Sequence, residues 1–450
     1  MKDNWQQQLK HLFYILFPVL VYQLANFSAQ LIDAMMTGNY HEVHLAGVSI
    51  GGNLWAPFFT LMTGTLSALT PIVGHHVGAR KDEEIAVDTQ QFIYLAIILS
   101  MSMIGIGIIL IRPILSAMNV STSIQAVAGN YLLYLALGIV PAFLFTVLRS
   151  FVDGLGLTRI SMAFMLLLVP FNILFNYTLI YGKFGFPQLG GSGAGLGTAL
   201  TYWVVLLVVI LIIKRHPQLK EYAIFRWHRI NFAKIGQFIK VGLPIGLAIF
   251  VEVAVFASVG LLMSRYSATI IAAHQSAMNF ATFLYGFPLS MSTALTIVIS
   301  QELGRRDYMA VRQFSKLGVR LSVGIAAFLM LGLFFNRETV AQAYGKSPEF
   351  IKQTVQFLSF ALLFQFSDAV ASPIQGILRG YKDTTMPFII GGISYWLVGI
   401  PVGLLLAKFS KIGPASFWVG LIVGLFTCGV LLSLRLHYLE KKLPVTEVEI

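Results

Sequence analysis

Charged residues and cysteine are both scarce in this sequence. Asp, Glu, Lys and Arg make up 11% of its 450 residues, whereas soluble domains carry about 25%. Hydrophobic residues reach 57%, and the mean hydropathy is +0.77. The only cysteine, Cys428, lies in an apolar segment, which excludes a disulfide framework. The composition therefore excludes a soluble globular protein and predicts an all-α, polytopic membrane protein.

Motifs for nucleotide-driven or hydrolytic chemistry are also missing. The sequence contains no G-x-x-x-x-G-K-[ST] phosphate loop, which argues against direct use of ATP, and no H-E-x-x-H or G-x-S-x-G motif. The glycine-rich run GGSGAGLG (190–197) lies between two apolar segments and follows no strand, so it resembles a dinucleotide-binding loop only superficially. We therefore expect neither an enzyme nor a bound cofactor.

Long apolar runs are abundant. A bilayer core is crossed by about 20 helical residues, and twelve segments satisfy this length. The basic N-terminus MKDNWQQQLKHLF continues directly into the first run without a small-residue cleavage motif, so we expect the first span to remain as an anchor. The predicted spans are 13–37, 45–74, 87–111, 129–150, 160–182, 195–213, 238–264, 270–300, 317–336, 353–377, 386–408 and 416–436.

Basic residues indicate how these spans are oriented. If the N-terminus is cytoplasmic, 23 of the 31 Lys and Arg residues fall on the cytoplasmic side and 8 on the other, in agreement with the positive-inside rule. We therefore expect both termini to be cytoplasmic. The same rule explains the net charge of +12. Nucleic-acid binding is not expected, because the bases are not grouped with aromatic residues on a soluble module.

An internal repeat relates the two halves of the chain. At an offset of 226 residues, Pro18 corresponds to Pro244, and SALTPIVGHHVGAR (67–80) aligns without a gap with TALTIVISQELGRR (293–306). A second stretch is matched at an offset of 224. There Gly156, Met162 and Phe164 correspond to Gly380, Met386 and Phe388.

Six spans, an even number, separate the two copies, so the halves have the same predicted orientation. The sequence thus predicts two six-helix lobes, 1–213 and 238–450, related by a parallel pseudo-twofold repeat, a plan that recurs in secondary transporters. A cytoplasmic basic linker, 214–237, joins them. Its Lys and Arg residues could contact anionic lipid headgroups, although a plain solvated connector is the favoured interpretation.

Three acids lie well inside predicted spans: Asp33, Glu252 and Asp368. A charged side chain at mid-membrane depth costs at least about 2.5 kcal/mol, and such residues usually face a bundle interior and mark ion pathways. The alternative is a structural ion pair, which is less favoured because no Lys or Arg is predicted at a comparable depth. Other acids fall in loops or at span ends, where we expect them to be solvated.

Asp33 has predicted partners on another helix. Asn172 and Asn176 are four residues apart and share one helical face, and buried amides need hydrogen-bonding partners. We therefore predict a cluster of Asp33, Asn172 and Asn176. The alternative is a hydrogen bond between helices that is unrelated to transport. Pro18, fifteen residues before Asp33, can bend or hinge that helix, or can serve packing alone.

Glu252 and Asp368 supply two carboxylates to the second half without an evident amide pair. Two hard anionic ligands, completed by carbonyl oxygens or water, suit a small cation such as Na+. His274 begins the eighth span and is interpreted as a packing residue. The adjacent His75 and His76 are expected to be solvated at a helix end.

Four stretches of the chain are characteristic: LAGVSIGGNLW (45–55), GTLSALTPIVGHHVGARK (64–81), AAHQSAMNFATFLYGFPLSMSTALTIVISQELGRRD (272–307) and ILRGYKDTTMPFIIGGISYWLVGIPVGLLL (377–406). In these stretches the chain resembles the multidrug and toxic compound extrusion (MATE) family, and the likeness extends over nearly the whole chain. It is most similar to the NorM branch.

The resemblance implies a V-shaped pair of six-helix lobes in a bacterial inner membrane. It also implies export of cationic amphiphilic drugs and dyes in exchange for H+ or Na+. The family's site residues fall on Asp33, Pro18, Asn172, Asn176, Glu252 and Asp368. One departure is Phe364, where members of the branch carry a tyrosine one turn before the second-lobe aspartate. The missing hydroxyl ligand would weaken or rearrange a Na+ site in the second lobe.

These features predict an antiporter that works by alternating access, as a monomer, with small cationic drugs, monovalent cations and membrane lipids as its partners. The alternative is a flippase for lipid-linked precursors of the same broad superfamily, which would need a cavity rich in Arg and Lys to hold phosphates. A passive channel and a lipid-modifying enzyme are less favoured. Three carboxylates on separate helices suit ion-coupled switching better than a selectivity ring.

Overall fold

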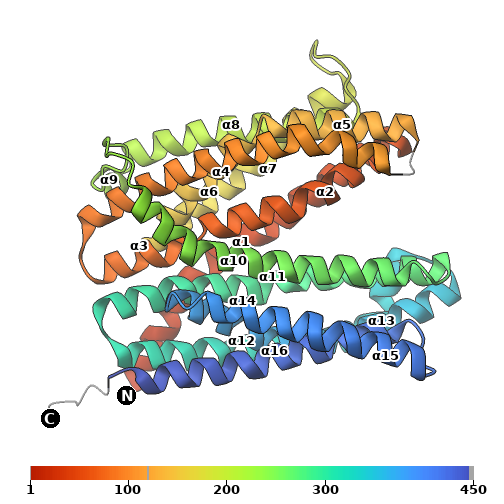
Figure 1. The fold of residues 1–450 in the computed structure, drawn as a ribbon. Helices are drawn as coiled ribbons and strands as arrows, with labels where there is room; N and C mark the ends of the chain where they lie inside the picture. Colours follow the sequence, from red (N-terminus) through yellow and green to blue (C-terminus); the bar gives the residue numbers. More distant parts are fainter. Residues whose placement is uncertain (1, 119–120, 445–450) are drawn as a thin grey trace. The chain divides into compact units, whose positions relative to one another are not determined.

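The computed structural model describes residues 2–118 and 121–444, and every regular element in this part of the chain is a helix (Figure 1). Helix α1 begins in the N-terminal segment and α16 ends just before the C-terminus. The helices are α1 (Lys2–Tyr40), α2 (Glu42–Leu66), α3 (Leu69–Gly78), α4 (Asp82–Ala117), α5 (Thr122–Ala136), α6 (Ile139–Gly154), α7 (Thr158–Tyr181), α8 (Gly191–Arg215), α9 (Pro217–Lys220), α10 (Phe232–Met263), α11 (Ala268–Arg305), α12 (Tyr308–Tyr344), α13 (Pro348–Gly380), α14 (Thr385–Gly392), the π-helix η1 (Ile393–Gly399), α15 (Ile400–Phe409) and α16 (Ala415–Lys442).

The helices match the predicted membrane spans. Among the described residues, 11 helices or continuous helix runs are long and apolar enough to cross a membrane. A twelfth is formed by α5 and α6, which are bent by 50° at a short break. The all-α fold with twelve spans is therefore confirmed. Apolar segments of this length form helices because a helix satisfies all of its backbone hydrogen-bonding groups internally when it lies in lipid.

The chain divides into two compact units. The N-terminal unit is Val21–Gly246, and the C-terminal unit comprises the described residues of Met1–Leu20 and Leu247–Ile450. The divisions thus fall inside α1 and α10, each two residues after one of the repeat-related prolines, Pro18 and Pro244. Proline removes one backbone hydrogen bond from a helix interior. Each point at which the chain passes from one unit to the other therefore follows a locally weakened helical turn. The lobe boundaries 1–213 and 238–450 remain predictions.

Within the N-terminal unit, α8 packs against α5, α6 and α7, and α2 packs against α5 (Figure 1). The glycine-rich run 190–197 belongs to this packing. A Cβ on Gly193 would lie 2.7 Å from the carbonyl oxygen of Leu179, and Gly195 touches the backbone of Tyr131 in the same way. Glycine at these positions lets helix backbones approach closely, as is common in membrane bundles. The run is therefore a packing surface of α8.

Within the C-terminal unit, α13 packs against α11, α12 and α16. The segment Thr385–Phe409 is interrupted by η1 and crosses α16 closely at glycines. A Cβ on Gly420 would lie 2.6 Å from the carbonyl oxygen of Gly399, and one on Gly424 would lie 3.2 Å from the Cα of Gly399. Short π-helical turns inside α-helices are often found at functional sites, and η1 lies next to the second carboxylate pair described below.

The internal repeat is visible in equivalent hydrogen bonds. Thr70 Oγ1 donates to the carbonyl oxygen of Ser150 at 3.3 Å, and Thr296 Oγ1 donates to that of Gly376 at 2.9 Å. Both residues of the second pair lie 226 positions after those of the first. Arg80 and Arg306, also 226 apart, both adopt left-handed backbone angles at helix ends.

The predicted second offset of 224 is wrong. Gly156 (φ 79°) and Lys382 (φ 61°) occupy the same left-handed position three residues after Asp153 and Arg379, whose carbonyl oxygens accept their N–H groups. These pairs are 226 apart. The offset of 224 came from a few identical side chains, whereas the backbone geometry of the turn aligns the two copies at 226. At this offset Gly156 of the first copy corresponds to Lys382 of the second, which adopts the same left-handed conformation under strain.

Candidate ion-coupling sites

Asp33 of α1 and the two asparagines of α7 form one polar cluster in the N-terminal unit. Asn176 Nδ2 lies 2.5 Å from Asp33 Oδ1 and 3.3 Å from Asn172 Oδ1. Asn176 is 0% exposed and Asn172 is buried, while Asp33 is half-buried. The spacing of four residues places both amides on the face of α7 that meets α1. The structure therefore brings together the three residues that the sequence singled out.

The second polar atom of Asn176 has no partner. Its Oδ1 is buried, and no hydrogen bond reaches it from any described residue. A buried acceptor without a donor is costly. A protonated Asp33 would supply that donor, because a carboxylic acid carries one O–H. The amide can thus donate to the ionised carboxylate and, if it turns over so that Oδ1 faces Asp33, accept from the protonated form.

Helix α8 leaves room for this amide. Gly197 lies directly against the side chain and backbone of Asn176, and a Cβ there would overlap the amide. A further contact holds α1 beside the cluster, because Tyr181 Oη of α7 donates to the carbonyl oxygen of Met36 at 2.8 Å. Within α1, Thr37 Oγ1 donates to the carbonyl oxygen of Asp33 at 2.8 Å. Sequence reasoning missed Gly197 and Tyr181. The sequence offered only one indication for Tyr181, which is that it follows Asn176 by five residues.

Asp368 of α13 lies deep in the C-terminal unit, with 2% of its surface exposed. Its Oδ1 accepts a hydrogen bond from Ser372 Oγ at 2.7 Å, one helical turn later. Its Oδ2 is buried and has no hydrogen-bond partner among the described residues. A buried carboxylate oxygen without a donor is costly unless a proton or a cation satisfies it.

Glu252 of α10 is half-buried in the same unit, and its charge interacts with that of Asp368. Arg379 of α13 also lies within electrostatic range of Glu252. The expectation that no Lys or Arg lies at a depth comparable to that of the three acids stays a prediction, but Glu252 does have a cation within electrostatic range. The predicted span ended at 377 and left Arg379 in a loop, whereas α13 continues to Gly380.

Hydroxyl groups surround this carboxylate pair. Tyr285 of α11 and Tyr395 of η1 are both within electrostatic range of Glu252 and Asp368. Phe364 packs edge-on against Phe256, with ring centroids 5.6 Å apart, and supplies no oxygen. The described residues contain no group of three or more His, Cys, Asp or Glu side chains arranged for a metal ion. A cation at this pair would therefore need hydroxyl or carbonyl oxygens or water as further ligands.

His274 is a packing residue. Trp418 Nε1 donates to His274 Nδ1 at 3.1 Å, and the Trp418 ring stacks on Phe357. The histidine is 4% exposed, so its neutral ring serves as the acceptor for a buried indole N–H that would otherwise be unpaired.

Three described acids outside the three candidates are buried, which contradicts the expectation that they are solvated. Asp153 of α6 is 3% exposed, Asp88 of α4 is 4% exposed and Glu302 of α11 is 6% exposed. Glu302 pairs with Arg305 of the same helix at 2.7 Å. All three acids lie within a turn or two of a helix end, where hydropathy cannot distinguish solvent from neighbouring helices.

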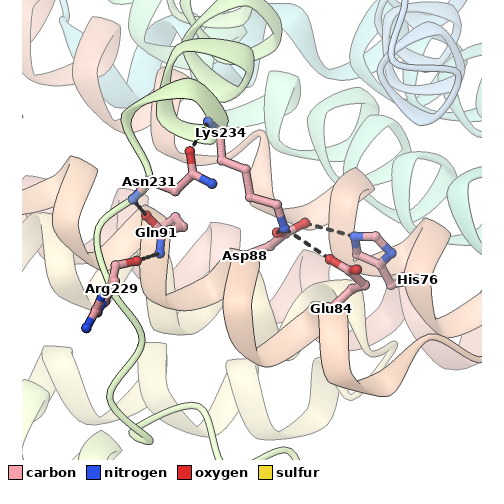
Figure 2. Close-up of polar contacts among 7 residues, drawn as sticks. All are labelled: His76, Glu84, Asp88, Gln91, Arg229, Asn231 and Lys234. Atoms are coloured by element: carbon pink, nitrogen blue, oxygen red, sulfur yellow. Dashed lines mark hydrogen bonds and ion pairs between the residues drawn. The ribbon is translucent and has the colours of Figure 1, made fainter.

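Asp88 forms an ionic cluster with residues of α3 and α10 (Figure 2). Its Oδ2 lies 2.9 Å from His76 Nε2, and its Oδ1 lies 2.7 Å from Lys234 Nζ. The same ammonium also contacts Glu84 at 3.0 Å. His76 is therefore paired, not simply solvated as the sequence suggested. This cluster ties the start of α10 to α4.

Comparison with known proteins agrees with this architecture. The MatE family model matches residues 18–178 and 244–405. The probable multidrug resistance protein NorM of Streptococcus pneumoniae is 47% identical over 428 residues, covering 95% of this chain and 94% of that protein. The protein with the same name in Bacillus subtilis is 41% identical, with 98% of each chain covered.

Solved structures share the fold. The eukaryotic MATE transporter AtDTX14 superposes with a TM-score of 0.84 at 22% identity, with 96% of each chain covered. The Vibrio cholerae MATE transporter VcmN in its bent form gives a TM-score of 0.86 at 17% identity, with 98% of each chain covered. Together with the near full-length relatives, these matches confirm the resemblance seen in the sequence: the chain belongs to the MATE family of transporters, in its NorM branch.

Proposed function

We propose that this protein is a multidrug efflux antiporter that exchanges cationic amphiphilic compounds for H+ or Na+. The observation that carries the proposal is the contact between Asp33 and Asn176, in which a half-buried carboxylate faces an amide with an unpaired acceptor. This arrangement accommodates both the ionised and the protonated acid. A group that is stable in both states can release a proton when a cationic substrate arrives.

Competition between the drug and the coupling ion for the same carboxylate follows from electrostatics. A positively charged drug and a coupling cation lower the energy of the same carboxylate, so each weakens binding of the other by the same factor. In the proposed cycle, H+ or Na+ binds in the outward-open state and displaces the drug. The ion is then released inside and is replaced by the next drug molecule.

The C-terminal carboxylates provide a second ion site in this proposal. Asp368 Oδ2 has no donor among the described residues, and Glu252 adds a second anionic ligand. Tyr285 and Tyr395 are the nearby hydroxyl groups that compensate for the missing hydroxyl at Phe364. Na+ is the cation that we assign to this pair. We further propose that the protein acts as a monomer in the bacterial plasma membrane, with both termini in the cytoplasm.

Dye efflux from proteoliposomes tests the proposal when a pH gradient and a Na+ gradient are imposed separately. We expect Asp33→Asn to abolish efflux driven by the pH gradient, and Glu252→Gln to abolish efflux driven by Na+. Ser28→Ala, which alters an exposed hydroxyl on α1 that bonds only within its own helix, is the matched control. Efflux that continues without either gradient would refute antiport.

A further inference from the structure

A small basic pocket lies in the N-terminal unit where α8 ends and the linker begins. Its volume is 230 Å3, and it is lined by the end of α8, by α9 and by the linker turn that follows. Three cationic side chains line it: Lys214, Lys220 and Arg226. No acidic side chain does, and all three cations are exposed. The pocket therefore presents a concentrated positive charge to an approaching ligand.

Apolar residues form the remainder of the lining. Phe225 is the accessible one, 38% exposed, and its ring centroid lies 5.4 Å from the Lys214 ammonium. Ile213, Leu219 and Ile224 are each 1% exposed or less and form the buried floor beneath it. A free inorganic anion gains nothing from such a surface. A ligand that joins a phosphate group to a hydrocarbon portion can use both the cations and the apolar side.

Two glutamines of α4 hydrogen-bond to the linker backbone, Gln90 at the edge of this pocket and Gln91 a few residues beyond it. Gln90 Nε2 donates to the carbonyl oxygen of Arg226 at 2.5 Å, and Gln90 Oε1 accepts from the backbone N–H of His228 at 2.5 Å. Gln91 Nε2 donates to the carbonyl oxygen of Arg229 at 3.0 Å, and Gln91 Oε1 accepts from the backbone N–H of Asn231 at 2.8 Å, as Figure 2 shows. Because the backbone is fixed before a ligand arrives, little ordering is needed on binding.

The surroundings are typical of a membrane–water interface. Helix α8 is an apolar candidate span that ends at Lys214 and Arg215. Beyond the pocket, the linker exposes Trp227 and the next helix exposes Phe232, at 83% and 73%. Exposed aromatic residues beside Lys and Arg at the end of a span are characteristic of contact with lipid headgroups.

We propose that this pocket binds the phosphodiester headgroup of one anionic phospholipid, such as phosphatidylglycerol. Lys214, Lys220 and Arg226 contact the phosphate, and the glycerol backbone lies against the exposed ring of Phe225. This proposal is independent of the transport mechanism, since none of these residues belongs to the carboxylate clusters. It replaces the interpretation of the linker as a plain solvated connector.

Native mass spectrometry of the purified, delipidated full-length protein tests the site. The protein is titrated with phosphatidylglycerol, with phosphatidylcholine or with glycerol phosphate, and the first binding constant is measured for each. We expect phosphatidylglycerol to bind at least ten-fold more tightly than phosphatidylcholine, and glycerol phosphate to bind at least ten-fold more weakly than phosphatidylglycerol. The combined variant Lys214→Gln, Lys220→Gln, Arg226→Gln should lose at least ten-fold in affinity for phosphatidylglycerol.

A matched control removes three basic residues outside the pocket: Arg215→Gln, Arg229→Gln and Lys240→Gln. It should retain the affinity of the unmodified protein, and an exchange of Lys220 for Arg inside the pocket should retain it too. Equal losses in both triple variants would show a diffuse charge effect and overturn the site. Glycerol phosphate binding as tightly as the lipid would overturn the assignment to a phospholipid. The melting temperature of each variant distinguishes misfolding from loss of the ligand.

Discussion

Asn176 of α7 donates a 2.5 Å hydrogen bond to Asp33 of α1 while its own carbonyl oxygen has no partner among the described residues. This hydrogen bond joins α1 and α7, which are far apart in sequence, and places a titratable carboxyl group where the two helices meet. A change in the charge of Asp33 must therefore alter how α1 is held against α7.

Removal of the Asn176 amide tests whether its hydrogen bond to Asp33 is needed for proton-coupled transport. We expect Asn176→Ala to reduce efflux driven by a pH gradient at least ten-fold, because Asp33 loses a charge-assisted hydrogen bond that is worth about 1.5–3 kcal/mol. Asn172→Ala should also reduce this efflux, because the Asn172 side chain hydrogen-bonds to Asp33 as well. Proteoliposome flux measures both variants. Equal activity of Asn176→Ala and the unmodified protein would contradict this role.

Gly197 offers a steric test of the same cluster. Substitution by Ala should displace the Asn176 amide, because the added Cβ would occupy its position, and we expect transport to fall several-fold. Gly52→Ala is the matched control on α2, since a Cβ there meets nothing within 4 Å. If both variants transport equally well, the position of Asn176 is not critical.

Ser372 donates a 2.7 Å hydrogen bond to Asp368 Oδ1, and no other described residue donates to this carboxylate. Ser372→Ala leaves both carboxylate oxygens without a donor, so we expect the Na+ concentration for half-maximal efflux to shift several-fold while the pH-driven component is retained. Ser367→Ala is the control, because that hydroxyl bonds to the carbonyl oxygen of Leu363 in its own helix. An unchanged Na+ response in Ser372→Ala would argue against a cation site at Asp368.

The packing role of His274 predicts a different response. Trp418→Phe removes the indole donor and leaves a buried ring nitrogen unpaired, which should cost about 1–3 kcal/mol of stability. A detergent-solubilised thermal melt measures the loss. The dependence of efflux on pH and Na+ should not change, and a shift in either would show that His274 takes part in ion coupling.

Lys234 tests the ionic cluster of Figure 2. Lys234→Met leaves Asp88 buried with His76 as its remaining partner. Breaking a buried pair from one side typically costs about 3–5 kcal/mol, so the melting temperature should fall clearly. Lys240→Met, an exposed position on the same helix, should leave it unchanged.

Hydropathy predicted the twelve spans well, because lipid permits only segments of this length and apolarity. The amide spacing on α7 likewise placed Asn172 and Asn176 beside Asp33. Sequence reasoning failed where side chains near helix ends turn inward: Asp88, Asp153 and Glu302 were all expected to be solvated and are buried. Their burial depends on which helices pack together, and neither hydropathy nor local spacing contains that information.

Release of protons on substrate binding tests the central claim most directly. A cationic dye is added to the purified protein in weakly buffered detergent solution, and bound dye and released protons are measured in the same sample. The account predicts close to one proton released per bound dye, a ratio that Asp368→Asn retains and Asp33→Asn loses. Dye binding without proton release in the unmodified protein, or release that survives Asp33→Asn, would contradict it.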